Sequence, residues 1–89
     1  MEAKNISAYK IWWVVILINK MSSNTRRKLA NRNYHSITGS NNLAMHYASR
    51  EKAEQAVAEA KELLRDGDIA TFLLITDKQF SEMQTVYGI

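Results

Sequence analysis

The segment from Tyr9 to Ile18 contains the run IWWVVILI, and no other feature of the chain constrains its fold as strongly. Aromatic and β-branched residues dominate the segment and turn formers are absent, a composition typical of a β-strand. Alternate residues of a strand point to opposite faces of the sheet, so this run is apolar on both faces. A strand that meets solvent on one face alternates polar and apolar residues. The segment therefore predicts a central strand that is covered on both sides.

The two tryptophans of this run, Trp12 and Trp13, are adjacent and therefore point to opposite faces of the predicted strand. They cannot form one stacking platform for a base or a ligand. Large aromatic side chains dominate burial in protein cores, so we predict that both tryptophans pack in the core.

The apolar run is too short to cross a membrane, because eight residues fall far below the roughly 20 that a spanning helix needs. It imitates the apolar region of a signal peptide, but no cleavage site of small residues follows it. We expect no membrane association and a cytoplasmic location, which would be the host cytoplasm for a phage-encoded protein. The absence of cysteine fits a reducing compartment.

A chain of 89 residues predicts a single domain over residues 1–89. Such a domain buries only about 60% of the surface of its unfolded chain, so its core is thin. Without cysteine, neither disulfides nor a thiolate zinc site can supplement it, and two histidines are too few for a convincing metal cluster. Oligomerisation is the remaining common supplement, and we expect a homodimer.

The clearest helix signal begins at Ser49, a good N-cap, and ends at Gly67. Its apolar residues form one continuous stripe at helical spacing, consisting of Ala53, Ala56, Val57, Ala60, Leu63 and Leu64. A second two-sided apolar strand follows at Ile69–Asp77. Thr76 and Gln79 then have the spacing of a capping box, which predicts a short C-terminal helix over residues 78–84.

The region between the first strand and this helix is mostly polar. The pattern of residues 34–38 predicts a strand that pairs with the first, and residues 39–42 predict a turn. We expect residues 43–49 to be an extended entry into the helix, and residues 22–33 to be a long polar loop with about one helical turn. The prediction is an α+β fold: a sheet of about three strands, one main amphipathic helix packed on it (β-β-α-β) and a short C-terminal helix.

Charge is distributed unevenly along the chain. Residues 1–50 carry eight lysines and arginines against one acid, a net charge of +7, whereas residues 51–89 carry four against eight acids, a net charge of −4. Such asymmetry between halves is a hint of an anionic partner. The basic segment NTRRKLANRNYHS, residues 24–36, holds four cations and no acid.

This basic segment is the best candidate for a binding site. Arginine and lysine neutralise phosphates, asparagine hydrogen-bonds bases or sugars, and Tyr34 or His35 is suited to stacking on an unpaired base. We predict binding of RNA or single strands rather than sequence-specific duplex DNA, because no predicted recognition helix carries the charge. The predicted site consists of Lys20, Arg26, Arg27, Lys28, Arg32, Asn33, Tyr34 and His35.

Four alternatives remain open for the same segment. The basic segment is equally typical of a solvated loop whose charges only maintain solubility. Its cations are also suited to pairing with the acidic helix, within one chain or across a dimer. In a protein–protein inhibitor the loop would dock on an acidic surface of a host toxin or nuclease, or the helix and the apolar strands would make the interface. A purely structural or accessory subunit would use it for neither purpose.

Motifs for catalysis are missing. No histidine has acids placed around it, and no serine stands in a nucleophile elbow. The stretch TGSNN lacks the ending of a phosphate-binding P-loop, and Asp66 and Asp68 around Gly67 are typical of a helix stop rather than a metal site. We therefore predict a protein that is not an enzyme, with no cofactor, no metal and no small-molecule substrate.

The run YHSITGSNNLAMHYASREKAEQAVAEAKELL, within residues 34–76, resembles a pattern found in small orphan proteins of bacteriophages and mobile elements. In these proteins a strand and turn precede an extended entry into an alanine- and glutamate-rich helix, and a final strand follows. The resemblance rests on Tyr47, Ser49, Ala53 and Ala56. It implies a host-takeover or anti-defence factor that binds and blocks a host toxin, nuclease or polymerase, in some cases together with RNA.

Overall fold

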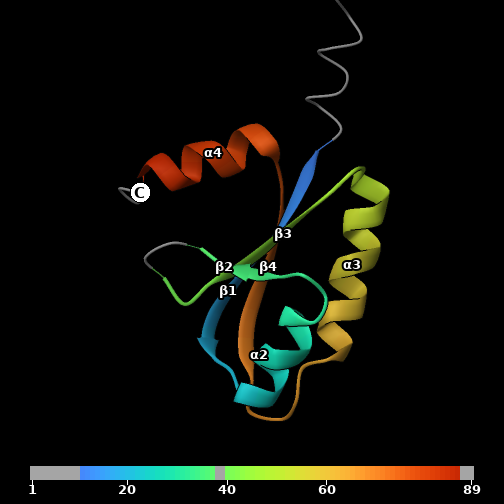
Figure 1. Ribbon diagram of the computed structural model, residues 1–89, viewed down its shortest axis with the longest axis vertical. Coiled ribbons are helices and arrows are strands. Elements are labelled where there is room, and N and C mark those ends of the chain that lie inside the picture. Colours follow the sequence, from blue (N-terminus) through green and yellow to red (C-terminus); the bar gives the residue numbers. More distant parts are fainter. Residues whose placement is uncertain (1–10, 38–39, 87–89) are drawn as a thin grey trace, which may run out of the picture.

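The computed structural model describes residues 11–37 and 40–86 (Figure 1). These residues form one four-stranded antiparallel sheet with the strand order β2-β3-β1-β4. The elements, in chain order, are β1 (Trp12–Lys20), α2 (Ser23–Ala30), β2 (His35–Ser36), β3 (Leu43–Tyr47), α3 (Arg50–Glu62), β4 (Ile69–Thr76) and α4 (Asp77–Val86).

The sheet is built around β1, as its two-sided apolar pattern predicts. β1 pairs with β3 on one side and with β4 on the other, and Val14, Val15 and Ile16 in its middle are fully buried. Because successive residues alternate between faces, Val14 and Ile16 belong to one core cluster and Val15 to another. The central position of β1 is confirmed.

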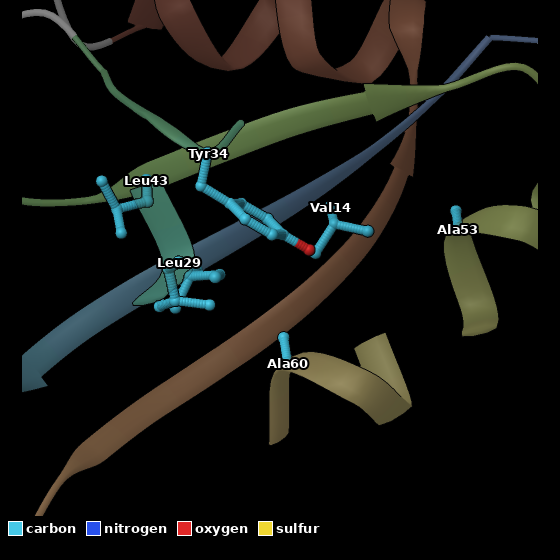
Figure 2. Close-up of a cluster of buried hydrophobic side chains, with 7 residues drawn as sticks. Val14, Leu29, Tyr34, Leu43, Ala53 and Ala60 are labelled. Atoms are coloured by element: carbon cyan, nitrogen blue, oxygen red, sulfur yellow. The ribbon is translucent and has the colours of Figure 1, made fainter. Parts of the chain in front are cut away.

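Helices α2 and α3 cover one face of the sheet. Leu29 of α2 and Ala53 and Ala60 of α3 are buried together with Val14, Ile16, Tyr34 and Leu43 in the larger core cluster (Figure 2). The small alanines let α3 lie close to the strands, and Ser49 caps this helix by accepting a hydrogen bond from the Lys52 amide at 3.1 Å.

Helix α4 covers part of the other face. Phe80 of α4 is buried with Val15 and Ala44, and its ring stacks on Trp13 with the ring centres 3.8 Å apart. Trp12 packs on the opposite cluster, so the two tryptophans occupy the two cores as predicted. The capping box of α4 is also present, because the Gln79 amide donates to Thr76 Oγ1 and the Thr76 amide donates to Gln79 Oε1.

The α+β class, the main helix and the C-terminal helix are confirmed, but three details of the prediction are wrong. The sheet has four strands, because residues 43–47 are a full strand that pairs with β1. Of the strand predicted over residues 34–38, the described part forms only His35–Ser36, which pairs with β3 and not with β1, and residue 38 lies outside the described residues. Residues 23–30, expected to be mainly loop, form the regular helix α2.

Candidate nucleic-acid interface

Helix α2 carries most of the basic segment. Hydrogen bonds fix both of its ends, and buried side chains fix its inner face on the sheet. Ser22 caps it by accepting a hydrogen bond from the Thr25 amide at 3.2 Å. Thr25 and Leu29, one turn apart, are fully buried and turn one face of α2 toward the sheet.

Asp68, in the turn before β4, completes this anchorage. Its carboxylate accepts hydrogen bonds from Thr25 Oγ1 at 2.6 Å, from the Arg65 amide at 2.8 Å and from the Ser22 amide at 2.9 Å. These hydrogen bonds, that of Thr25 foremost, lower the pKa of Asp68. The predicted helix-stop role of the DGD sequence is thus joined by a second one, which is to fix the start of α2.

The C-terminal end of α2 is a Schellman motif. The Tyr34 amide donates to the Leu29 carbonyl at 3.2 Å and the Asn33 amide donates to the Ala30 carbonyl at 2.9 Å. Asn33 adopts the left-handed conformation that this motif needs, with φ of 74°. The turn directs the Tyr34 side chain into the core cluster that contains Leu29 and Val14, where Figure 2 shows it.

The outer face of α2 is polar and basic. Four exposed residues lie on one side of the helix, at the spacing i, i+3, i+4 and i+7: Asn24, Arg27, Lys28 and Asn31. Within residues 11–37 and 40–86, neither Arg27 nor Lys28 forms an ion pair. We call these four residues the α2 stripe.

Three further cations of the predicted site border the α2 stripe in different ways. Lys20 is exposed at the end of β1, just before the helix. Arg26 lies on the flank of α2 and donates from Nη1 to the Asn41 carbonyl at 3.2 Å. Arg32, which follows α2, pairs with Glu59 of α3 at 3.0 Å, although both side chains remain about half exposed. The alternative in which basic residues pair with the acidic helix thus holds for Arg32.

Arg32 stands at the rim of a polar pocket between α3 and the turn after α2. The pocket has a volume of about 300 Å³, at the lower end of the range typical of small-ligand sites. Its walls combine two cations, one acid and two phenols with an amide and a methyl group, from Arg32, Tyr34, Tyr47, Lys52, Gln55, Ala56 and Glu59.

Tyr34 does not serve as the stacking platform expected from the sequence. Its side chain is only 4% exposed, and its hydroxyl accepts a hydrogen bond from the Tyr47 hydroxyl at 3.2 Å. Burial, assisted by this neighbour, raises the pKa of Tyr34 well above its ordinary value. Tyr34 is a core residue whose hydroxyl reaches the wall of the pocket.

His35 is also separated from the α2 stripe. Neighbouring strand residues point to opposite faces, so His35 lies on the α4 side of the sheet, with its ring 6.3 Å from that of Trp13. There it lines a second pocket of about 350 Å³ together with Trp13, Ser36, Ile37, Asp77, Phe80, Ser81 and Gln84. The predicted site therefore divides, with its cations and Asn33 around α2 and His35 on the far face.

Sequence reasoning missed the α3 contribution to the first pocket. Lys52, Gln55 and Glu59 recur every three or four residues, so they form a polar row on one side of α3. This spacing was visible in the sequence, but that the row faces Arg32 follows only from the packing of α3 beside α2.

Within the described ranges 11–37 and 40–86, no three histidine, aspartate or glutamate side chains converge as metal ligands. In the same ranges, no helix has both the length and the apolar character needed to cross a membrane. Comparisons of the chain with models of protein families, with curated proteins and with solved structures found no match.

Proposed function

We propose that this chain is a non-enzymatic binding protein that holds single-stranded RNA, or a similar polyanion, along the α2 stripe. The observation that carries the proposal is the exposed pair Arg27 and Lys28, which has no carboxylate partner in the described part of the chain. The two cations share one helix face with Asn24 and Asn31, whose amides can bond sugars or bases.

A strand of RNA suits this surface for electrostatic reasons. Each phosphate that a lysine or arginine neutralises releases condensed counterions, which favours binding most at low salt. Helix α2 contains no acidic residue that would repel phosphates, and the exposed Lys20 extends the positive charge beyond the start of the helix.

The preference for single strands needs a new reason, because the sequence-based one assumed that no helix carries the charge, and α2 does. The pocket at Arg32 supplies that reason. An unstacked nucleotide can enter a polar pocket of about 300 Å³, where Lys52 and Gln55 offer donors, whereas a base within a duplex cannot.

The wider role follows from the resemblance to phage and mobile-element proteins. In this proposal the protein acts in the cytoplasm as an inhibitor of a host factor, and RNA is part of the inhibited complex. The absence of cysteine agrees with a reducing compartment.

Fluorescence anisotropy of a short labelled single-stranded RNA tests the proposal. We expect binding that weakens as salt rises from about 50 to 200 mM. Arg27→Ala with Lys28→Ala should weaken it and reduce the slope of log K against log salt by about 1.4, because each lost contact to a single strand contributes about 0.7. A duplex DNA of the same sequence should bind less tightly.

The matched control is Arg50→Ala with Lys78→Ala. It removes the same charge from the start of α3 and from α4, which lie at the end of the sheet opposite α2 (Figure 1). Circular dichroism confirms that both variants are folded. Equal weakening by both pairs would show that net charge, not the α2 stripe, attracts RNA. Absence of RNA binding at low salt would overturn the proposal. If an acidic protein then bound wild type but not Arg27→Ala with Lys28→Ala, the partner would be a protein.

A further inference from the structure

Strand β4 has the composition of a central strand but stands at an edge. Its sequence IATFLLIT holds six apolar residues, no charge and no proline. Among the described residues it pairs with β1 on one side only, and none of its eight residues is buried, whereas three residues of β1 are. Ile69 is 55% exposed and is the large apolar side chain that the described residues leave open.

The backbone groups on the open side of β4 can be assigned from its pairing. The Asp77 amide donates to the Ile11 carbonyl at 3.2 Å, so the odd-numbered residues that precede it turn their N–H and C=O groups to β1. The even-numbered residues Ala70, Phe72 and Leu74 turn theirs outward. Thr76 agrees with this alternation, because its amide bonds to the Gln79 side chain and not to β1.

Natural sheets protect long edges with charges, prolines, bulges or a very short strand. The opposite edge is short, because β2 has only two residues and leaves only the last three residues of β3 beyond it. At β4, the Lys61 ammonium lies 5.8 Å from the centre of the Phe72 ring, on the α3 side of the sheet, so it lies over a side chain of the edge strand. The open edge of β4 therefore has the features of a surface that pairs with another strand.

We propose that two copies of this chain pair through β4, antiparallel and about a two-fold axis at Phe72. In this register Phe72 of one copy lies opposite Phe72 of the other. Ala70 of each copy lies opposite Leu74 of the other copy. All three outward-facing residues then exchange backbone hydrogen bonds, and Thr76, whose amide is already engaged, is left outside the ladder.

The side chains are complementary in the same register. On the α3 side, Ala70 meets Leu74 and Phe72 meets Phe72. On the other side, Ile69 meets Ile75 and Thr71 meets Leu73, so the exposed Ile69 gains an apolar neighbour. Pairing also ends at two copies, because a two-fold contact uses both β4 edges and leaves only the short opposite edges, made of β2 and the last residues of β3. The expected product is a continuous eight-stranded sheet. The inference does not depend on RNA binding.

Mass measurement by light scattering or sedimentation tests the dimer. The chain of 10.2 kDa should have twice that mass at micromolar concentration. Thr71→Lys, at an exposed position, should give a folded monomer because a lysine would meet Leu73 of the partner. Ala48→Lys, exposed beyond β3 and two strands away, is the matched control and should remain a dimer. A wild-type monomer, or a Thr71→Lys dimer, would overturn the proposal.

Hydrogen exchange and cross-linking test the register. In the dimer the amides of Ala70, Phe72 and Leu74 should become protected to the level of Leu73 and Ile75, and lose protection in Thr71→Lys. Because the chain has no cysteine, Phe72→Cys places a single thiol near the axis, within disulfide range at the roughly 5.5 Å between paired Cα atoms. It should cross-link on mild oxidation, whereas Ala48→Cys should not. A dimer without these effects would place the interface elsewhere.

The two proposals fail separately. Thr71→Lys should lose the dimer and keep RNA binding, which would separate the β4 interface from the RNA site. Arg27→Ala with Lys28→Ala should lose RNA binding and keep the mass of the dimer.

Discussion

Thr25 and Asp68 are 43 residues apart in the chain, yet the hydroxyl of one donates to the carboxylate of the other at 2.6 Å. The same carboxylate accepts the Ser22 and Arg65 amides, so one side chain joins the start of α2 to the turn after α3. The position of the α2 stripe therefore depends on a residue outside the basic segment.

This junction predicts a specific pH dependence. The pKa of Asp68 is lowered in the folded protein, chiefly by the Thr25 hydrogen bond. Its contribution to stability is therefore complete above the ordinary aspartate pKa of about 3.9 and is lost as the pH falls through the lower folded value. Asp68→Asn should unfold at a lower temperature than wild type near neutral pH, and the two melting curves should converge in acid. A constant difference at all pH values would contradict the assignment.

Tyr34 is expected to behave as a core residue in mutagenesis. Tyr34→Phe removes one hydrogen bond, worth about 0.5–1.5 kcal/mol, while Tyr34→Ala empties a buried site at a cost of about 3–5 kcal/mol in the free energy of unfolding. Chemical denaturation measures both. A Tyr34→Ala variant as stable as wild type would show that the ring is not part of the core.

The raised pKa of Tyr34 adds an alkaline prediction. The unfolded chain releases this proton near pH 10, whereas the folded one holds it to higher pH. Stability contributed by the protonated phenol is therefore present below about pH 10 and declines above it. Tyr34→Phe should lack this part of the decline, and its absorbance titration should match that of wild type until unfolding. If wild type showed one more phenolate near pH 10 than Tyr34→Phe does, Tyr34 would titrate like an exposed tyrosine, which would contradict its burial.

Elements whose signals are local were predictable from the sequence. The two-sided apolar pattern of β1, the Ser49 cap of α3 and the capping box at Thr76 all lie within a few residues of what they determine. Each survives in the structure because tertiary contacts agree with the local preference.

The remaining errors come from long-range contacts. Helix α2 has two buried residues, Thr25 and Leu29, and is stabilised by Asp68, which no local pattern indicates. The five residues of β3 become a strand because β1 offers them a partner. The candidate site was predictable as a set of cations, but its division was not. Tyr34 faces the core and His35 faces the opposite side of the sheet. These directions depend on the Schellman turn at Asn33, which determines how the chain enters the sheet after α2.

Asn33 provides a test of that turn. Its φ of 74° lies in the left-handed region, which glycine and asparagine tolerate and which β-branched residues avoid. Asn33→Gly should leave stability nearly unchanged, whereas Asn33→Val should cost about 1–2 kcal/mol. Thermal denaturation of the pair measures the difference. Equal stabilities would show that the turn does not need this conformation.

The stacked pair Trp13 and Phe80 determines how firmly α4 covers its face of the sheet. Their rings are nearly parallel, 3.8 Å apart, and the Trp13 indole donates to Asp77 Oδ1 at 2.8 Å. Phe80→Ala should cost about 3–5 kcal/mol and, in a Trp12→Phe background, shift Trp13 fluorescence to the red as water reaches the indole. Lys78→Ala, exposed on the same helix, should change stability by less than about 0.5 kcal/mol and leave the spectrum unaltered. An unshifted spectrum in a folded Phe80→Ala variant would show that α4 does not need this stack to cover Trp13.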